Sequence, residues 1–412
     1  MNLQDNFIPF HRPFIGAKEE EAAIRVLRSL WLTTGKETQF LEQEFAAYLE
    51  SNYSQPATHS IHPEPLACLA VNSATSGLHL ALEACGVMPG DLVLVPTYTF
   101  TSSAEVVRYL GADVVFVDSL PGGFHIDPVS LEETLKKLPP GRAKAVMPVH
   151  FGGLPCDMEA VLSIAEKYSL KVIEDAAHSF PSPLAPSPHV GPGVMAGCAG
   201  DAGVFSFYAT KTITTGEGGM IATRNSALAK RMSIMRSHGI DRSIFKRYTD
   251  KKASWYYEVL APGFKYNIPD LLSAVGRAQL SRTDEMLALR LAIAKRYDEA
   301  FAGDKHFTIP PTGPGDARHL YPIRINSRAL RIGRNEFIER LQEQGIGVSV
   351  HFIPLHTMPY YKQRYNLNET DFPNALESYS RVISLPIWPG MTENQVERVI
   401  TVVKNLGITY TF

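Results

Sequence analysis

Lys211 is the residue of this chain with the most evident chemical potential. It lies in a Thr-rich loop closed by glycines, between two short β-prone runs. We expect its amine to lose solvation among Phe205, Phe207 and Tyr208, which disfavours the ammonium form and leaves an amine that can add to a carbonyl as a Schiff base. Taken alone, the loop favours an ordinary surface lysine, because surface lysines vastly outnumber catalytic ones.

A second stretch changes that balance. The run from Val172 to Asp175 reads as a buried strand that ends in a carboxylate. In α/β proteins the ligand sites lie at the carboxyl ends of parallel strands, so Asp175 stands where such a site is expected. A carboxylate at that place suits a pyridinium nitrogen. His178, which follows, fits a helix cap, a core histidine or a cofactor contact.

A turn of small hydroxylated residues, Asn72 to Gly77, could bind an anion. It follows a short apolar strand and leads into a helix with apolar periodicity. The first backbone amides of a helix have no partner inside the helix, so a phosphate group fits at this turn. The alternative is a capped helix start without a ligand, which is the commoner case.

The elements around these residues define the fold class. From Ala67 to Asp175, apolar strands alternate with helical stretches of about ten to fifteen residues, which predicts an α/β protein with a mostly parallel sheet covered by helices on both faces. Two helices near the N-terminus are separated by a break at residues 33–35. A helix over 270–302 suits a connection between domains, and the Pro- and Gly-rich residues 181–200 predict a surface or interface loop.

Composition restricts the classes of function. The 412 residues carry a formal net charge of −2, with 45% hydrophobic and 20% charged residues, which is typical of a globular protein and gives no overall field for nucleic acid or an anionic membrane. The four cysteines lack paired spacing, so we expect neither disulfides nor a zinc site. The sequence shows no secretion signal and no apolar run of membrane-spanning length, so we expect a cytoplasmic enzyme.

Seven motifs together resemble the DegT/DnrJ/EryC1/StrS family of nucleotide-sugar aminotransferases, which are fold-type I enzymes dependent on pyridoxal 5'-phosphate (PLP). The resemblance extends over most of the chain and implies a large PLP-binding α/β domain over 1–262, with the N-terminal helical segment, and a smaller α+β domain over 263–412. It also implies a homodimer with active sites at the subunit interface. The motifs are VNSATSGLHLAL, VPTYTFTSSA, VHFGGLPCDM, EDAAHS, FSFYATKTITTGEGG, FKYNIPD and VHFIPLHTMPYY.

The resemblance assigns roles to single residues. Lys211 is implied to hold PLP and act as general base, and Asp175 to pair with the pyridine nitrogen. Phe100 is implied to stack on the pyridine ring, with Tyr98 as the neighbour to consider if the register differs, and His178 lies near the cofactor in relatives. The implied phosphate contacts are Thr75, Ser76, Ser206 and, reaching across the dimer, Asn267.

The implied reaction moves an amino group, with L-glutamate as the expected donor, to the keto sugar of a nucleotide-diphosphate sugar. Three alternatives remain: a dehydratase that uses the pyridoxamine form of the cofactor, where histidine commonly replaces the lysine; an amino-acid aminotransferase, for which Arg381 could bind the carboxylate of the donor; and a non-enzymatic binding protein.

His351 and His356 suggest a metal, but a structural or substrate-lining role fits their spacing better. A set of basic residues could bind the diphosphate as a group: Arg236, Arg242, Lys246, Arg247, Lys251 and Lys252.

Overall fold

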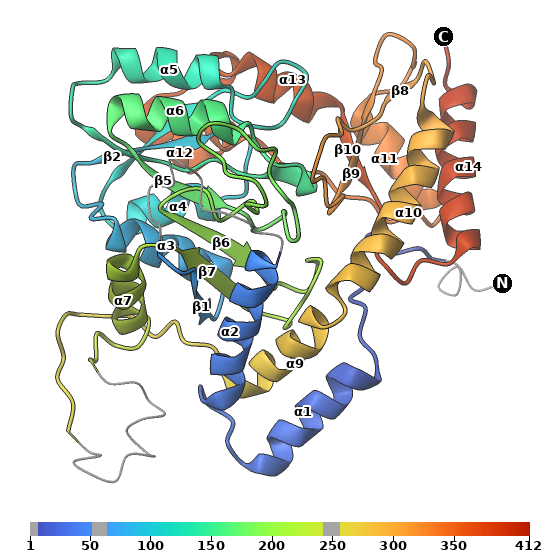
Figure 1. Ribbon diagram of the computed structural model, residues 1–412. Coiled ribbons are helices and arrows are strands. Elements are labelled where there is room, and N and C mark those ends of the chain that lie inside the picture. The colour runs from blue at the N-terminus through green and yellow to red at the C-terminus, as the bar shows by residue number, and fades with distance from the viewer. Residues whose placement is uncertain (1–6, 52–63, 242–255) are drawn as a thin grey trace.

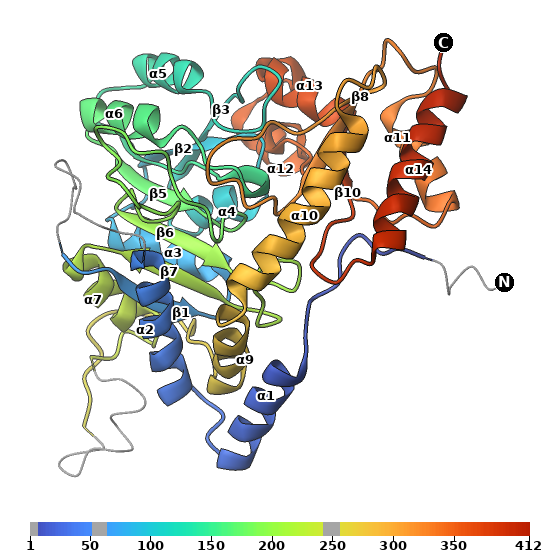
Figure 2. The same cartoon turned by 45° about the vertical axis from the view of Figure 1, so that its right-hand side comes forward.

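The protein has a large sheet-centred part and a smaller part, joined by a long helix (Figures 1 and 2). The computed structural model describes residues 7–51, 64–241 and 256–412. Five of the basic residues named above, all except Arg236, therefore lie outside the described residues. Within the described ranges, no helix is long and apolar enough to cross a membrane.

A seven-stranded mixed sheet forms the centre of the large part, in the order β1-β7-β6-β5-β4-β2-β3. The strands from β2 to β6 pair in parallel, and β7 runs antiparallel between β6 and β1. The predicted α/β class with a mostly parallel sheet is thus confirmed. The strand bounds are β1 Ala67–Val71, β2 Leu92–Pro96, β3 Asp113–Val117, β4 Ala143–Val146, β5 Lys171–Asp175, β6 Ala202–Ser206 and β7 Gly219–Thr223.

Helices cover both faces of this sheet because successive strand residues point to opposite sides. Along β5, for example, Val172 belongs to the core under α5 and α6, whereas Ile173 belongs to the core shared with α3, α4 and α7. Helix α2 covers the first of these faces at the β1–β7–β6 end. The bounds are α2 Lys36–Glu50, α3 Ala74–Ala84, α4 Ser102–Tyr109, α5 Pro128–Lys137, α6 Met158–Tyr168 and α7 Ser226–Met235.

The smaller part packs helices against a three-stranded antiparallel sheet in the order β10-β9-β8. Its core joins α10, α11 and α14 to the strands and also includes Ile8, so the N-terminal segment crosses to this part of the molecule. The bounds in this part are α10 Thr283–Phe301, β8 Phe307–Thr308, β9 Tyr321–Ile325, α11 Arg334–Glu343, β10 Val382–Leu385 and α14 Glu393–Thr409, and the segment between α11 and β10 contains α12 Pro359–Tyr365 and α13 Pro373–Arg381.

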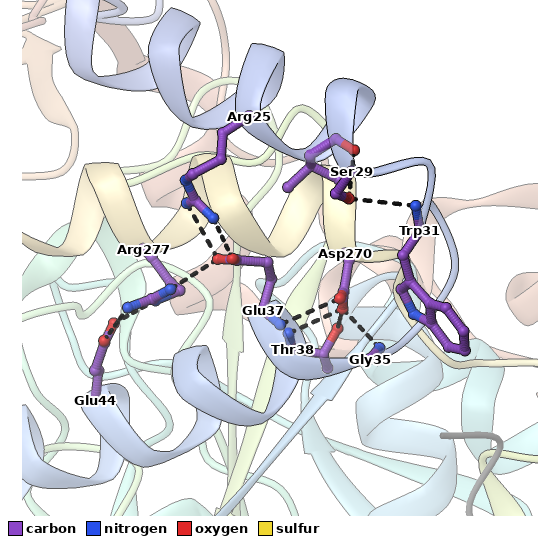
Figure 3. Close-up of polar contacts among 10 residues, drawn as sticks. Arg25, Ser29, Trp31, Gly35, Glu37, Thr38, Glu44, Asp270 and Arg277 are labelled. Carbon is purple, nitrogen blue, oxygen red and sulfur yellow. Dashed lines mark hydrogen bonds and ion pairs between the residues drawn. The ribbon is translucent and has the colours of Figure 1, made fainter. Parts of the chain in front are cut away.

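Asp270 fixes the break between the first two helices, α1 (Ala17–Ser29) and α2 (Figure 3). Its carboxylate accepts hydrogen bonds from the amides of Gly35, Glu37 and Thr38, at 2.7, 3.1 and 3.0 Å. A carboxylate at a helix N-terminus satisfies amides that lack intrahelical partners. The predicted helix–break–helix arrangement is confirmed, and Asp270, at the start of α9 (Asp270–Leu280), ties it to the sequence that leads into the smaller part.

Two sequence-based expectations differ from the structure. The helix expected over 270–302 is two helices, α9 and α10, with a break at Ser281 and Arg282. Residues 181–200 lack regular structure as expected, but side chains such as Val190 and Met195 are buried in the core, so the segment is not simply a surface loop.

The division into domains at residue 262 stays a prediction. Helix α9 packs on α1 and α2, and residues from Leu355 to Phe372 pack against the core of the large part. Both of these segments come after residue 262 in the sequence.

Candidate active site

A cavity of about 560 Å³ opens at the carboxyl ends of the parallel strands. Residues that follow β1 and β2 line it, together with the last residues of β5 and β6. The N-terminal segment and residues 319–320 and 349–352 close its other side. This edge of the sheet is where α/β proteins bind ligands, as the sequence predicts for Asp175.

Lys211 lines the cavity from the connection between β6 and β7. This connection is the predicted Thr-rich loop, and hydrogen bonds hold it, among them Phe207 N to Gly218 O at 2.9 Å and Thr215 N to Phe207 O at 3.0 Å. Burial lowers the pKa of Lys211 to about 8, and the charge of Asp175 opposes that shift. The amine therefore exists partly in its neutral, nucleophilic form near neutral pH.

Asp175 lies in the same cavity, buried at the end of β5. Its carboxylate accepts a hydrogen bond from Ser103 Oγ at 2.8 Å and one from the amide of Ala177 at 3.2 Å. Burial raises its pKa above the usual range, whereas these two hydrogen bonds and the charge of Lys211 act in the opposite direction. The structure therefore brings together the two residues on which the sequence prediction rests.

The expected aromatic surroundings of the lysine are partly wrong. Tyr208 lines the cavity, but Phe205 and Phe207 belong to the core with Phe45 on the other face of the sheet. The alternation of strand side chains explains this, because Ser206 points towards the cavity and its two neighbours point away. Four histidines, described below, line the cavity together with the lysine.

The turn between β1 and α3 presents the N-terminus of α3 to the cavity. Ser73, Ala74 and Thr75 line it, and Ser73 Oγ caps the helix by accepting from Ser76 N at 3.1 Å. Ser76 is placed differently from Thr75: its hydroxyl donates to Ser73 O at 2.7 Å, and it is not among the lining residues. The amides of this first turn and the helix dipole suit a phosphate.

Ser206 and Gly219 complete this turn. Ser206 lines the cavity at the end of β6. A Cβ atom added to Gly219 would lie 2.8 Å from Ala74 N, so only glycine allows β7 to begin so close to the turn. The last glycine of the GEGG sequence is therefore required sterically beside the turn that is predicted to bind phosphate.

Two aromatic side chains and His178 form one wall. Phe100 is 56% exposed and lines the cavity, with its ring 5.8 Å from that of Phe352. His178 is buried, stacks on Phe352 at 5.8 Å, and accepts from Gly152 N through Nδ1 at 3.3 Å. Tyr98 is fully buried and donates to the carbonyl of His351, so Phe100 and not Tyr98 is available for stacking on a bound ring.

Asn267 and Ser76 are the two residues of the predicted set that do not line the cavity. Its Nδ2 donates to Thr34 Oγ1 at 2.6 Å, and its Oδ1 is buried without a hydrogen-bond partner in the described chain. An amide placed outside its own cavity is what the predicted reach across a dimer requires. The partner-site role of Asn267 remains a prediction.

Four histidines line the cavity: His178, predicted as a cofactor contact, His351, predicted to have a structural or substrate-lining role, and His11 and His319, which the sequence analysis does not select. Burial is the main cause of a lowered pKa in each, to about 4 in His11, to about 3 in His351, and well below the usual value in His178 and His319. The charge of Lys211 acts in the same direction on all four. Positions 11, 319 and 351 are too far apart in sequence for spacing alone to reveal this grouping.

Other candidates from the sequence lie outside the cavity. His356 is buried and bonds to Thr97 Oγ1 at 2.7 Å, and the described residues contain no cluster that could hold a metal ion. Arg381 donates to the carbonyl of Ile325 at 2.8 Å and pairs with Glu377. It does not line the cavity, so it is not placed to bind the carboxylate of an amino-acid donor there.

The fold and the cavity define a fold-type I PLP enzyme. The amine of Lys211, the buried carboxylate of Asp175, the exposed ring of Phe100 and the helix N-terminus at Thr75 fit the aldehyde, the ring nitrogen, the ring face and the phosphate of PLP. The cavity therefore contains a group suited to each part of this cofactor.

The sequence matches the DegT/DnrJ/EryC1/StrS aminotransferase family over residues 13–404, so the chain belongs to this family and its cofactor is PLP. It is 40% identical over 407 residues to the spore coat polysaccharide biosynthesis protein SpsC of Bacillus subtilis (strain 168), with 98% of each chain covered.

Two solved structures show the same fold. Spr1654 of Streptococcus pneumoniae, assigned as a sugar aminotransferase and solved in its PLP form, is similar with a TM-score of 0.83 and 29% identity, covering 98% of this chain and 99% of that one. PseC of Helicobacter pylori, an aminotransferase of pseudoaminic acid biosynthesis, is similar with a TM-score of 0.84 and 26% identity, covering 98% of this chain and 100% of that one.

Proposed function

We propose that this sugar aminotransferase transfers the amino group of L-glutamate to the keto sugar of a nucleotide-diphosphate sugar, in the synthesis of amino sugars for surface glycans or antibiotics. The observation that carries the proposal is the pair of Lys211, with its pKa lowered to about 8, and buried Asp175 in one cavity of the family fold. We place the reaction in the cytoplasm, where nucleotide sugars are made.

The chain's own residues would divide the work. Lys211 Nζ would hold the cofactor and, once released, would carry the proton from the donor's α-carbon to the cofactor carbon that bears the amino nitrogen. Asp175 keeps a proton on the ring nitrogen by charge pairing. Thr75 and Ser206, which line the cavity, would hold the phosphate, while Phe100 and His178 would contact the ring. Bound PLP supplies the electron-withdrawing ring that makes the α-proton acidic.

Absorption spectroscopy tests the first half of this proposal. Purified protein with PLP should show a near-visible band that L-glutamate shifts to shorter wavelength, and a keto-sugar nucleotide should shift it back. Lys211→Ala should bind PLP without turnover, whereas Lys305→Ala, an exposed lysine of the smaller part, should behave as wild type. Protein that binds no PLP would contradict the enzyme assignment and favour the non-enzymatic alternative.

The same experiment separates the dehydratase alternative. A pyridoxamine-dependent dehydratase would release water from the sugar and leave no amino group on the product. Lys211 counts against that reaction, because the lysine is commonly replaced by histidine there. Product mass therefore decides between amination and dehydration.

We further propose a homodimer in which Asn267 reaches the phosphate bound in the partner subunit's cavity. Two inactive variants, Lys211→Ala and Asn267→Ala, test this when they are mixed and allowed to exchange subunits. In a mixed dimer one cavity has both native residues if Asn267 acts across the interface, so activity should return. Activity that stays absent in demonstrated mixed dimers would place Asn267 in its own chain's site or outside any site.

A further inference from the structure

His319 is a cavity residue whose imidazole ring forms no hydrogen bond with the described chain. It is 4% exposed and lines the cavity, and its ring lies 4.6 Å from that of His178. Its Nδ1 atom is buried without a hydrogen-bond partner among the described residues. The other ring nitrogen, Nε2, also has no hydrogen-bond partner among the described residues and is not one of the fully buried atoms, so it is available to a group bound in the cavity.

Arg290 lies behind His319 on α10. Its side chain is fully buried, and Nη1 donates to the carbonyl oxygens of His319 and Ile387 at 3.1 and 2.9 Å, two residues that line the cavity. Its Nε and Nη2 atoms have no hydrogen-bond partner in the described chain, and no carboxylate there is paired with it. Burial lowers the pKa of Arg290 to about 10, so the guanidinium stays charged at neutral pH.

An uncompensated cation at this end of the cavity favours an anion. The charge of Arg290 contributes to the lowered pKa of both His11 and His319, so both side chains lie within its field. The same field that disfavours a proton on these rings stabilises a negative group beside them. The described carboxylates that line the cavity, Asp175 and Glu217, come instead from β5 and from the loop before β7.

The reactants differ in the charge that they bring into the cavity. An α-amino acid donor carries a carboxylate next to the reacting carbon, whereas the keto sugar is neutral at its reacting carbon. Among the described lining residues, Lys211 is the one lysine and no arginine is present, and Lys211 is committed to the cofactor and to proton transfer. A carboxylate therefore needs hydrogen-bond donors other than a lining arginine.

We infer that the α-carboxylate of the amino donor binds at the end of the cavity formed by His11 and His319, with the imidazole of His319 as its hydrogen-bond donor and Arg290 as the buried charge that positions this histidine. The inference rests on the proposed aminotransferase function. His319 is then a substrate-contact residue, and Arg290 acts through it.

Binding of glutarate to the PLP-loaded protein tests this directly, because glutarate has the two carboxylates of glutamate and no amine to react. Loss of a hydrogen bond to a charged group weakens binding about tenfold. Calorimetry should therefore show about tenfold weaker glutarate binding for His319→Phe and a smaller loss for His319→Gln, which keeps an N–H donor. His306→Gln is the matched control, since His306 bonds to Asp304 and Thr411 outside the cavity and the substitution should leave glutarate binding unchanged.

Steady-state kinetics with the two substrates are the second test of the carboxylate site. His319→Phe should raise the KM for L-glutamate about tenfold and leave the KM for the keto-sugar nucleotide within twofold. Arg290→Gln should show the same asymmetry and Arg290→Lys should reduce it, because lysine restores the charge. If Arg290→Gln does not fold, the His319 variants decide alone.

The outcomes separate this inference from the proposed function. Wild-type turnover with L-glutamate, together with unchanged glutarate affinity and glutamate KM in His319→Phe, would overturn the inference and leave the function standing. An equal rise in both KM values would also overturn it, since it would indicate a general distortion of the site. Absence of any amino transfer by the wild type would refute the function, while the glutarate measurement would still test the carboxylate site.

Discussion

Glu174 and Asp175 are adjacent carboxylates on one strand, yet the structure uses them in opposite ways. Glu174 points to the side of the sheet away from the cavity, is fully buried, and accepts from the amides of Gly197, Ala199 and Gly200 at 2.7 to 2.8 Å. His150 Nε2 lies 2.9 Å from the same carboxylate. Its hydrogen bonds are complete, so it stabilises the fold and has no capacity left for a ligand.

Asp175, by contrast, has two hydrogen-bond donors in the described chain, Ser103 and Ala177, and faces Lys211 and open volume. A buried carboxylate is therefore available to a ligand only when some of its own hydrogen-bonding capacity is not used by the protein. Burial and sequence position alone do not distinguish the two residues, because both are buried at the end of β5.

Replacement of Asp175 should have the largest effect on activity. Asp175→Asn removes the charge that we propose to hold the proton on the ring nitrogen, so kcat should fall on the order of a thousandfold. The free energy of unfolding should change by less than about 1 kcal/mol, because a buried charge with few hydrogen bonds is lost. Steady-state kinetics and urea unfolding measure the two quantities, and a strongly destabilised variant would contradict the contrast with Glu174.

The matching change on the other face should act on stability. Glu174→Gln cannot accept all four hydrogen bonds and leaves buried donors unpaired, so the free energy of unfolding should fall by about 3 kcal/mol. At a temperature where the variant remains folded, kcat should stay within about tenfold of the wild type. A loss of kcat as large as that of Asp175→Asn would show that the two carboxylates are not functionally separate.

The pKa of Lys211 offers a direct measure of which carboxylate acts on it. The charge of Asp175 raises this pKa against the larger lowering by burial, so Asp175→Asn should move it below about 8. Glu174→Gln should leave it near about 8. The rate of amine labelling at Lys211 against pH, in protein freed of PLP and read by peptide mass spectrometry, gives the value for each variant.

Replacement of Ser103, which donates a hydrogen bond to Asp175, should have the smallest effect on activity of these changes. Ser103→Ala removes a hydrogen bond that lowers the pKa of Asp175, so the carboxyl group should titrate at higher pH and kcat should fall about fivefold. The acidic limb of the pH–rate profile should move to higher pH. An unchanged limb would show that Asp175 is not the group that limits activity in acid.

The sequence predicts the α/β class and several of the site residues because local signals carry them. Strand and helix periodicity specify the sheet, and Lys211, Asp175 and Thr75 each follow a recognisable strand or turn. The faces of β6 were assigned wrongly for Phe205 and Phe207, since an aromatic run does not show which side of a sheet faces a ligand.

The remaining features depend on tertiary contacts. His11 and His319 meet in the cavity only after both parts of the molecule have folded, and the return of residues 355–372 to the large core has no local signal. The break at Ser281 separates two well-formed helical patterns and contains neither proline nor glycine to reveal it. Sequence periodicity therefore indicates the elements but not these junctions.

The N-terminal segment has a consequence for the order of assembly. Ile8 N bonds to Gly345 O at 2.9 Å and Gly347 N to Ile8 O at 2.8 Å, and His11, a few residues on, bonds to the carbonyl of Ala209 beside Lys211 at 2.9 Å. During synthesis on the ribosome, Ile8 emerges long before its partners at 345–347. This part of the cavity wall must therefore wait for nearly the whole chain, so the active site is completed only when the smaller part has folded.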